Sequence, residues 1–151
     1  MKQLANTALT QGVTGLPFRF LLCCLALLLA GCGDNQFAFL DNGGGQSLSV
    51  VREQKYILGP WTSTLVSAAT PRCQKRHALE GMAEGDFLLK VYRPEQGVFI
   101  LNAGPRWFVT ELQNCEFQMY RTPPPFPGEA VGRFEVRNKS LEFIADKPAK
   151  R

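Results

Sequence analysis

The side chains best suited to chemistry in this sequence are its five cysteines and its single histidine. Cys73 and Cys115 lie about 40 positions apart, and His77 follows Cys73 by four. Two thiols can form a disulfide, bind a metal, or supply a nucleophile activated by a histidine. A zinc site needs four ligands and this chain has one histidine, while Cys73 and His77 match no known catalytic motif. The choice depends on the compartment, and therefore on the N-terminus.

The first 31 residues have the order of a secretory signal peptide. Residues 1–19 contain Lys2 and Arg19 and no acidic residue, and residues 20–30 form an uncharged apolar run of 11. As a helix this run is about 16 Å long, roughly half of a bilayer core. A basic segment, a short apolar segment and small residues predict export rather than a membrane span.

The apolar run ends at Leu29-Ala30-Gly31-Cys32, which resembles the lipobox of bacterial lipoproteins. The resemblance covers residues 1–32 alone. It implies a diacylglyceryl group on the Cys32 sulfur, cleavage of residues 1–31 and acylation of the new amino group, so that Cys32 anchors the protein to a membrane. Gly33, rather than an acidic residue, follows the cysteine, which by the same resemblance favours the outer membrane, facing the periplasm. An uncleaved N-terminal anchor is the alternative.

Export changes what the remaining cysteines predict. Cys23 and Cys24 lie inside the segment expected to be removed, and Cys32 is expected to carry lipid. Cys73 and Cys115 are then an even pair in an oxidising compartment, which favours a disulfide over a metal site or a catalytic thiol. A bridge closing a loop of roughly 40 residues contributes about 4 kcal/mol by the chain-entropy argument.

A dense basic segment surrounds Cys73. Residues 71–77 read PRCQKRH, and the cluster within it consists of Arg72, Lys75, Arg76 and His77. Such a cluster can contact lipid phosphates, an anionic polysaccharide or an acidic protein surface. An ordinary solvated loop carries similar runs of charge, so both interpretations stay open.

Catalytic signatures are missing from the sequence. The chain contains no GxSxG, no HExxH, no phosphate-binding glycine loop and no EF-hand pattern. Acidic pairs such as Glu80 and Glu84 are interpreted as surface charge rather than a glycosidase dyad. We therefore expect a protein that is not an enzyme and that needs no cofactor or metal.

Four large aromatic residues allow two interpretations. They can line a carbohydrate-binding surface, or they can be part of the hydrophobic core, which strand spacing favours; they are Trp61, Tyr92, Trp107 and Tyr120.

Composition excludes several classes of protein. The 14 glycines and 10 prolines are spread along the chain, which argues against an all-helical fold. Residues 1–31 hold two of the 17 basic residues and none of the 13 acidic ones, so the rest of the chain keeps 15 basic and 13 acidic residues. So small an excess argues against a nucleic-acid binder.

The body of the chain predicts an all-β domain. Apolar and polar residues alternate in eight segments separated by turn residues, from which we expect the six or seven strands of a small antiparallel sandwich or barrel. The segments are 48–58, 61–69, 87–92, 98–101, 107–112, 115–120, 133–137 and 141–144. Three hairpin-linked strands from 87 to 120 are the strongest part of the pattern, with RPEQG as a five-residue loop.

Finer features follow from the same periodicity. Alternation places Cys115, Phe117 and Met119 on the core face of one strand, and a second hairpin is expected to turn at Asn138-Lys139. Residues 74–82 are the one stretch expected to hold a short helix.

Residues 123–128, PPPFPG, predict an extended loop because proline has no backbone N–H to donate to a sheet. This loop is either a stiff connector or a docking site centred on Phe126.

We therefore divide the chain into four parts. Residues 1–31 are expected to be a cleaved signal peptide, 32–47 a lipidated flexible tether, 48–146 the β-rich domain and 147–151 a basic tail. Phe37, Phe39 and Leu40 interrupt the polar tether, either to dock on the domain or to meet the membrane interface.

The expected function is a non-catalytic binding or scaffolding role in the cell envelope, with another envelope protein or peptidoglycan as partner. Two alternatives remain: a periplasmic inhibitor of a cell-wall hydrolase, and a small envelope hydrolase.

Overall fold

The computed structural model describes residues 33–82 and 87–146, and these form an antiparallel all-β domain with one disulfide, as the sequence predicts. The described part contains ten strands rather than six or seven: β1 (Asp34–Gly43), β2 (Gln46–Gln54), β3 (Trp61–Ala69), β4 (Cys73–Ala78), β5 (Leu88–Glu95), β6 (Val98–Ala103), β7 (Arg106–Glu111), β8 (Glu116–Tyr120), β9 (Glu129–Arg137) and β10 (Ser140–Ala145). They form two sheets, with orders β1-β2-β3-β4 and β10-β9-β5-β6-β7-β8.

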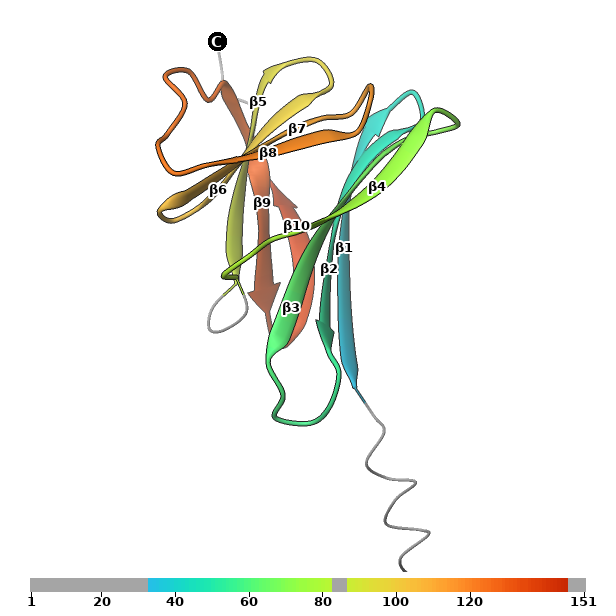
Figure 1. Ribbon diagram of the computed structural model, residues 1–151, viewed down its shortest axis with the longest axis vertical. Helices are drawn as coiled ribbons and strands as arrows, with labels where there is room; N and C mark the ends of the chain where they lie inside the picture. The colour runs from blue at the N-terminus through green and yellow to red at the C-terminus, as the bar shows by residue number, and fades with distance from the viewer. Residues whose placement is uncertain (1–32, 83–86, 147–151) are drawn as a thin grey trace, which may run out of the picture. The chain divides into compact units, whose positions relative to one another are not determined.

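The core lies between the two sheets. Figure 1 shows the first sheet in blue to green and the second in yellow to red. Because side chains alternate across a strand, each sheet sends every second residue inward. The largest side chains that are fully buried there include Leu48, Val50, Leu65, Leu89, Val91, Phe99, Leu101, Phe108 and Phe134.

The sheets also meet along both pairs of edges. At one side β1 lies beside β10, and the Gln36 side-chain amide donates to the Lys139 carbonyl at 3.1 Å. At the other side Cys73 at the start of β4 is bonded to Cys115, just before β8. Edge strands, which otherwise leave backbone groups unpaired, are thus covered or covalently tied.

The two hairpin regions of the prediction are confirmed. Strands β5, β6, β7 and β8 follow one another as a meander, and β9 and β10 turn at Asn138-Lys139, both with positive φ. The RPEQG loop is shorter than expected. Strand β5 runs on through Glu95, which pairs with Val98, so Gln96-Gly97 alone makes the turn.

The flexible tether expected at 32–47 is wrong for its described part. Residues 34–43 are strand β1, paired along its length with β2, and the domain begins at Gly33 instead of residue 48. Gln36, Ala38 and Leu40 face inward, while Phe37 and Phe39 between them are 62% and 49% exposed. Large apolar side chains on the outer side, together with the Gly, Asn and Asp content, obscured the alternation of a strand. Gly43, Gly44 and Gly45 all have positive φ and form the β1–β2 turn.

The short helix expected within residues 74–82 is also wrong. Residues 73–78 are strand β4, paired with β3 from Cys73↔Ala69 to Thr64↔Ala78. This strand is an edge of its sheet, so most of its side chains are exposed, two of them, Lys75 and Arg76, are charged, and the apolar alternation of a central strand is missing.

The core face expected for Cys115, Phe117 and Met119 holds only in part. Cys115 is fully buried and Phe117 is partly buried against Phe108, but Met119 is 50% exposed. Strand β8 is the edge of the second sheet, and its far end extends beyond the cover of the first sheet.

The segments expected to be a signal peptide, a lipobox and a basic tail, at residues 1–32 and 147–151, lie outside the described residues. Within residues 33–82 and 87–146 no helix is long and apolar enough to cross a bilayer.

Candidate functional site

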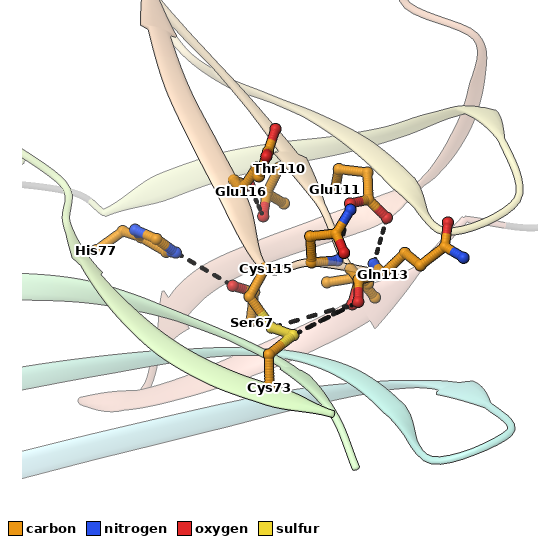
Figure 2. Close-up of a disulfide and its surroundings, with 10 residues drawn as sticks. Ser67, Cys73, His77, Thr110, Glu111, Gln113, Cys115 and Glu116 are labelled. Atoms are coloured by element: carbon orange, nitrogen blue, oxygen red, sulfur yellow. Dashed lines mark hydrogen bonds between the residues drawn. A yellow bond between two sulfur atoms is a disulfide. The ribbon is translucent and has the colours of Figure 1, made fainter. Parts of the chain in front are cut away.

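The disulfide predicted between Cys73 and Cys115 is present (Figure 2). It joins the first residue of β4 in one sheet to the turn between β7 and β8 in the other. Glu111 organises that turn, because its carboxylate accepts hydrogen bonds from the backbone amides of Gln113 and Asn114. The bridge therefore ties the basic strand to an ordered turn of the meander.

His77 lies four residues after Cys73 on β4, at the same junction between the two sheets. Its ring stacks on Phe117 of β8, and its Nε2 shares a hydrogen bond of 3.2 Å with the Ser67 hydroxyl, drawn in Figure 2. Burial, and then the positive charge of Lys75, lower the pKa of His77 below its ordinary value, and a hydrogen bond with the Cys115 backbone partly opposes them. These surroundings favour the neutral form of the ring, and its packing on Phe117 gives His77 a structural role.

The basic cluster of Arg72, Lys75, Arg76 and His77 is divided by the strand that carries it. Lys75 and His77 project from one side of β4, while Arg76 projects from the other and pairs with Glu53 at 3.3 Å. Arg72 lies in the turn before β4. Since side chains alternate across a strand, these four residues do not converge on one anion.

Arg52 is a buried cation that the sequence analysis missed. It occupies an inward position of β2, is 3% exposed, and lies between the rings of Trp61 and Phe87 at 4.7 and 4.8 Å from their centroids. Its Nη1 donates to the Gln36 side chain at 3.4 Å, and its Nε has no hydrogen-bond partner among the residues that the structure describes. Burial lowers the pKa of this guanidinium. The inward alternation of Leu48, Val50 and Arg52 was the available signal.

Three of the four large aromatic residues, for which strand spacing favoured the core over a binding surface, lie on the outer surface of the second sheet. The inward positions of β5, β6 and β7 are taken by apolar residues, including Val91, Leu101 and Phe108. Their neighbours in sequence must therefore face outward. Tyr92, Trp107 and Tyr120 occupy such positions, and we call this set the aromatic face.

The residues of the aromatic face are neighbours across three strands. Trp107 and Tyr120 pair directly between β7 and β8, and the rings of Tyr92 and Trp107 lie 6.2 Å apart at an interplanar angle of 31°. Ile100 of β6 lies beneath Tyr92 at 5% exposure. Tyr120 is 42% exposed, while Tyr92 and Trp107 are half-buried. The three rings thus form a nearly continuous aromatic surface on a rigid sheet.

Polar groups border this surface. Lys90 pairs with Asn102, which in turn pairs with Trp107, so amine and indole lie in one row across the sheet. The Tyr120 hydroxyl donates to the Gln118 side chain. On the far side of Lys90, Arg133 is held by Glu135 at 2.6 Å, a contact that raises the pKa of the arginine further.

A hollow of about 430 Å³ lies at the end of β8, and Tyr120 is part of its lining. Its lining combines apolar side chains with two arginines and one carboxylate: Glu80, Pro105, Arg106, Met119, Tyr120 and Arg121. Arg106 and Met119 alternate with Trp107 and Tyr120, so the hollow opens on the side of the sheet opposite to the indole of Trp107. The rings of the aromatic face, with the amide and amine groups that border them, suit a ligand that has apolar C–H faces and hydroxyl groups.

Trp61 is the exception among the four aromatic residues. It lies at the start of β3 and stacks on Arg52, away from the aromatic face. Among the described residues no group of three or more His, Cys, Asp or Glu side chains converges as a metal site.

Comparison with known proteins assigns no family. No protein-family model, no curated protein and no solved structure matches the chain.

Proposed function

We propose that this protein is a lipoprotein, anchored through Cys32 to the outer membrane and facing the periplasm, whose β domain is a non-catalytic binding module for the glycan strands of peptidoglycan. The observation that carries the binding proposal is the aromatic face of Tyr92, Trp107 and Tyr120.

Two features support the anchor and the compartment. Leu29-Ala30-Gly31-Cys32 resembles a lipobox, and Gly33 at the next position favours the outer membrane. The remaining cysteines of the mature chain, Cys73 and Cys115, are bonded to each other, and structural disulfides persist in oxidising compartments such as the periplasm.

The chemistry of the aromatic face supports a glycan ligand. A pyranose ring presents polarised C–H groups that pack on the electron-rich face of an aromatic ring. Lys90, in the same row as Trp107, and Gln118, beside Tyr120, offer hydrogen bonds to the hydroxyl and N-acetyl groups of a glycan. A rigid sheet also presents the rings without an entropic cost of ordering a loop.

The anchor is tested with Cys32→Ser in cells labelled with radioactive palmitate. We expect the wild-type protein to incorporate label and to fractionate with the outer membrane, and the variant to incorporate none. A variant that keeps both the label and the membrane association contradicts the lipid anchor.

Glycan binding is tested by co-sedimentation with purified peptidoglycan sacculi. We expect Trp107→Leu and Tyr92→Leu to lower binding about tenfold, equivalent to about 1.4 kcal/mol, and Trp107→Phe to retain most of it because a ring remains. Tyr56→Leu, on a distant loop, is the matched control. Equal binding by all variants, with unchanged thermal unfolding, contradicts the proposal.

A second candidate, inhibition of a cell-wall hydrolase, is favoured by one observation. Phe126 is 84% exposed at the centre of the proline-rich segment, where fixed φ angles hold it ready to enter a cleft. An assay of sacculus hydrolysis by periplasmic extract separates the two functions. Inhibition that Phe126→Ser abolishes and Trp107→Leu leaves intact supports the inhibitor.

A further inference from the structure

The loop between β2 and β3 exposes three consecutive large apolar side chains. Tyr56 is 56% exposed, Ile57 65% and Leu58 94%. Single exposed apolar residues are ordinary on protein surfaces, whereas a contiguous group at a loop tip marks a surface that meets something apolar.

This loop lies beside the point where the described chain begins. A Cβ placed on Gly33 would lie 2.4 Å from the carbonyl oxygen of Gln54 and 3.2 Å from that of Lys55. Asp34, the next residue, pairs with Gln54. Figure 1 shows the β2–β3 loop at the same end of the first sheet as the start of β1. We call this the Gly33 end of the domain.

Cys32 precedes Gly33 directly, so its Cα lies about 3.8 Å from that of Gly33. Strand pairing that begins at Asp34 leaves one residue, Gly33, between the expected lipid attachment and the folded domain. Acyl chains on Cys32 therefore hold the Gly33 end at the bilayer surface, because no tether separates them.

Exposed cationic side chains occupy the same end. Lys55 begins the loop. Lys139 lies in the β9–β10 turn, and its backbone carbonyl accepts the hydrogen bond from the side chain of Gln36, near the start of β1. Arg137 precedes that turn and pairs with Glu135 at 2.7 Å, and Asp34 follows Gly33 directly in sequence. Lysine and arginine near a membrane surface are attracted to anionic headgroups and extend their charges toward them.

From these positions we propose that Ile57 and Leu58 insert into the interfacial region of the bilayer beside the lipid on Cys32, with Lys55 and Lys139 at the headgroups. The inference rests on the proposed lipid anchor and adds to it a fixed orientation. Two contacts, acyl chains and an apolar loop, hold a domain more firmly than one.

The orientation points the opposite end of the second sheet away from the membrane. Strand β5 begins at Leu88, just after Phe87, which touches Arg52 near the Gly33 end, and it runs past Tyr92 to Glu95. The segment carrying Phe126 ends beside Arg93 and Pro94, where Gly128 packs on their backbone. The aromatic face is therefore displaced from the bilayer toward the wall.

The inference is tested with the full, lipidated protein reconstituted into vesicles of phosphatidylethanolamine and phosphatidylglycerol, with and without brominated acyl chains. Two variants each add one tryptophan: Ile57→Trp at the loop and Phe126→Trp at the opposite end, with the wild type measuring the native indoles. We expect brominated lipid to quench the added emission at position 57 by at least twofold and to leave that at position 126 unchanged.

The two proposals fail in different ways. Protein that floats with the vesicles and carries labelled palmitate, but shows no quenching at position 57 or equal quenching at both positions, overturns the loop insertion and leaves the anchor standing. The same result is expected if a second copy or another protein covers the loop. Protein that carries no palmitate label overturns the anchor, and the oriented insertion with it.

Discussion

The imidazole of His77 lies nearly parallel to the phenyl ring of Phe117, with ring centroids 4.6 Å apart and an interplanar angle of 12°. His77 belongs to β4 of the first sheet and Phe117 to β8 of the second. This stack joins the same two sheet edges that the Cys73–Cys115 disulfide joins a few residues away. The two sheets are thus tied along this pair of edges by one disulfide and one aromatic stack.

The His77 contact predicts a dependence of stability on pH. Its folded pKa lies below the ordinary value near 6.5, so below that pH the unfolded chain binds the proton more readily than the folded one, and stability falls as the pH falls. We expect urea unfolding to show the stability advantage of wild type over His77→Gln shrinking from pH 7.5 to pH 5. An advantage that stays constant or grows on acidification contradicts this.

Removal of the disulfide is expected to loosen one junction before the rest of the domain. The Cys73→Ala/Cys115→Ala variant should lose about 2–5 kcal/mol of unfolding free energy. Because the bridge joins β4 to the β7–β8 turn, hydrogen exchange should rise in β4 and β8 more than in β2 and β5. Reduced wild-type protein is the control. Uniform loss of protection, or none, argues against local pinning.

The buried guanidinium of Arg52 is expected to matter for its volume more than for its charge. Arg52→Ala leaves a gap between Trp61 and Phe87 and should cost about 2–4 kcal/mol. Arg52→Met fills that space without a desolvated charge, and should change stability by less than about 1 kcal/mol. Chemical denaturation measures both, with the exposed Arg93→Ala as control. A methionine variant as unstable as the alanine variant shows that the charge itself is required.

The β9–β10 turn carries strain that glycine can relieve. Lys139 has a φ of 65° in the second position of a two-residue turn, where Asn-Gly is the preferred pair. Lys139→Gly should raise the unfolding free energy by about 0.5–1 kcal/mol, since the left-handed cost exceeds the added entropy of the unfolded chain. Lys139→Ala keeps the Cβ and is the matched control. Equal stability of both variants contradicts the expected strain.

Local alternation was sufficient to predict several elements. The meander of β5 to β8 and the hairpin at Asn138-Lys139 follow from apolar residues at every second position between turn residues. The pairing of Cys73 with Cys115 followed from counting the cysteines of a chain that is expected to be exported. These features depend on neighbours in sequence, or on a count, and need no knowledge of which surfaces pack together.

The edge strands were harder to predict because solvent covers part of them. Strand β4 carries Lys75 and Arg76 where a central strand would carry apolar residues. In β1 the inward side chains are those of Gln36, Ala38 and Leu40, and most of the other positions are polar. A strand that buries one weakly apolar side has little alternation to detect, so its pairing partner decides its structure.

The sequence by itself determined the fold class, the disulfide and the resemblance of residues 1–32 to a lipoprotein anchor. The tertiary structure alone decided which side of each strand is the core. Tyr92 and Trp107 were indistinguishable from core aromatics until Val91 and Phe108 were seen to fill the interior beside them. Likewise the closeness of Gly33 to the Tyr56–Leu58 loop arises from the β1–β2 pairing, a contact between residues about 20 positions apart. Alternation assigns two sides to a strand, but only packing against the opposite sheet shows which side remains free to bind.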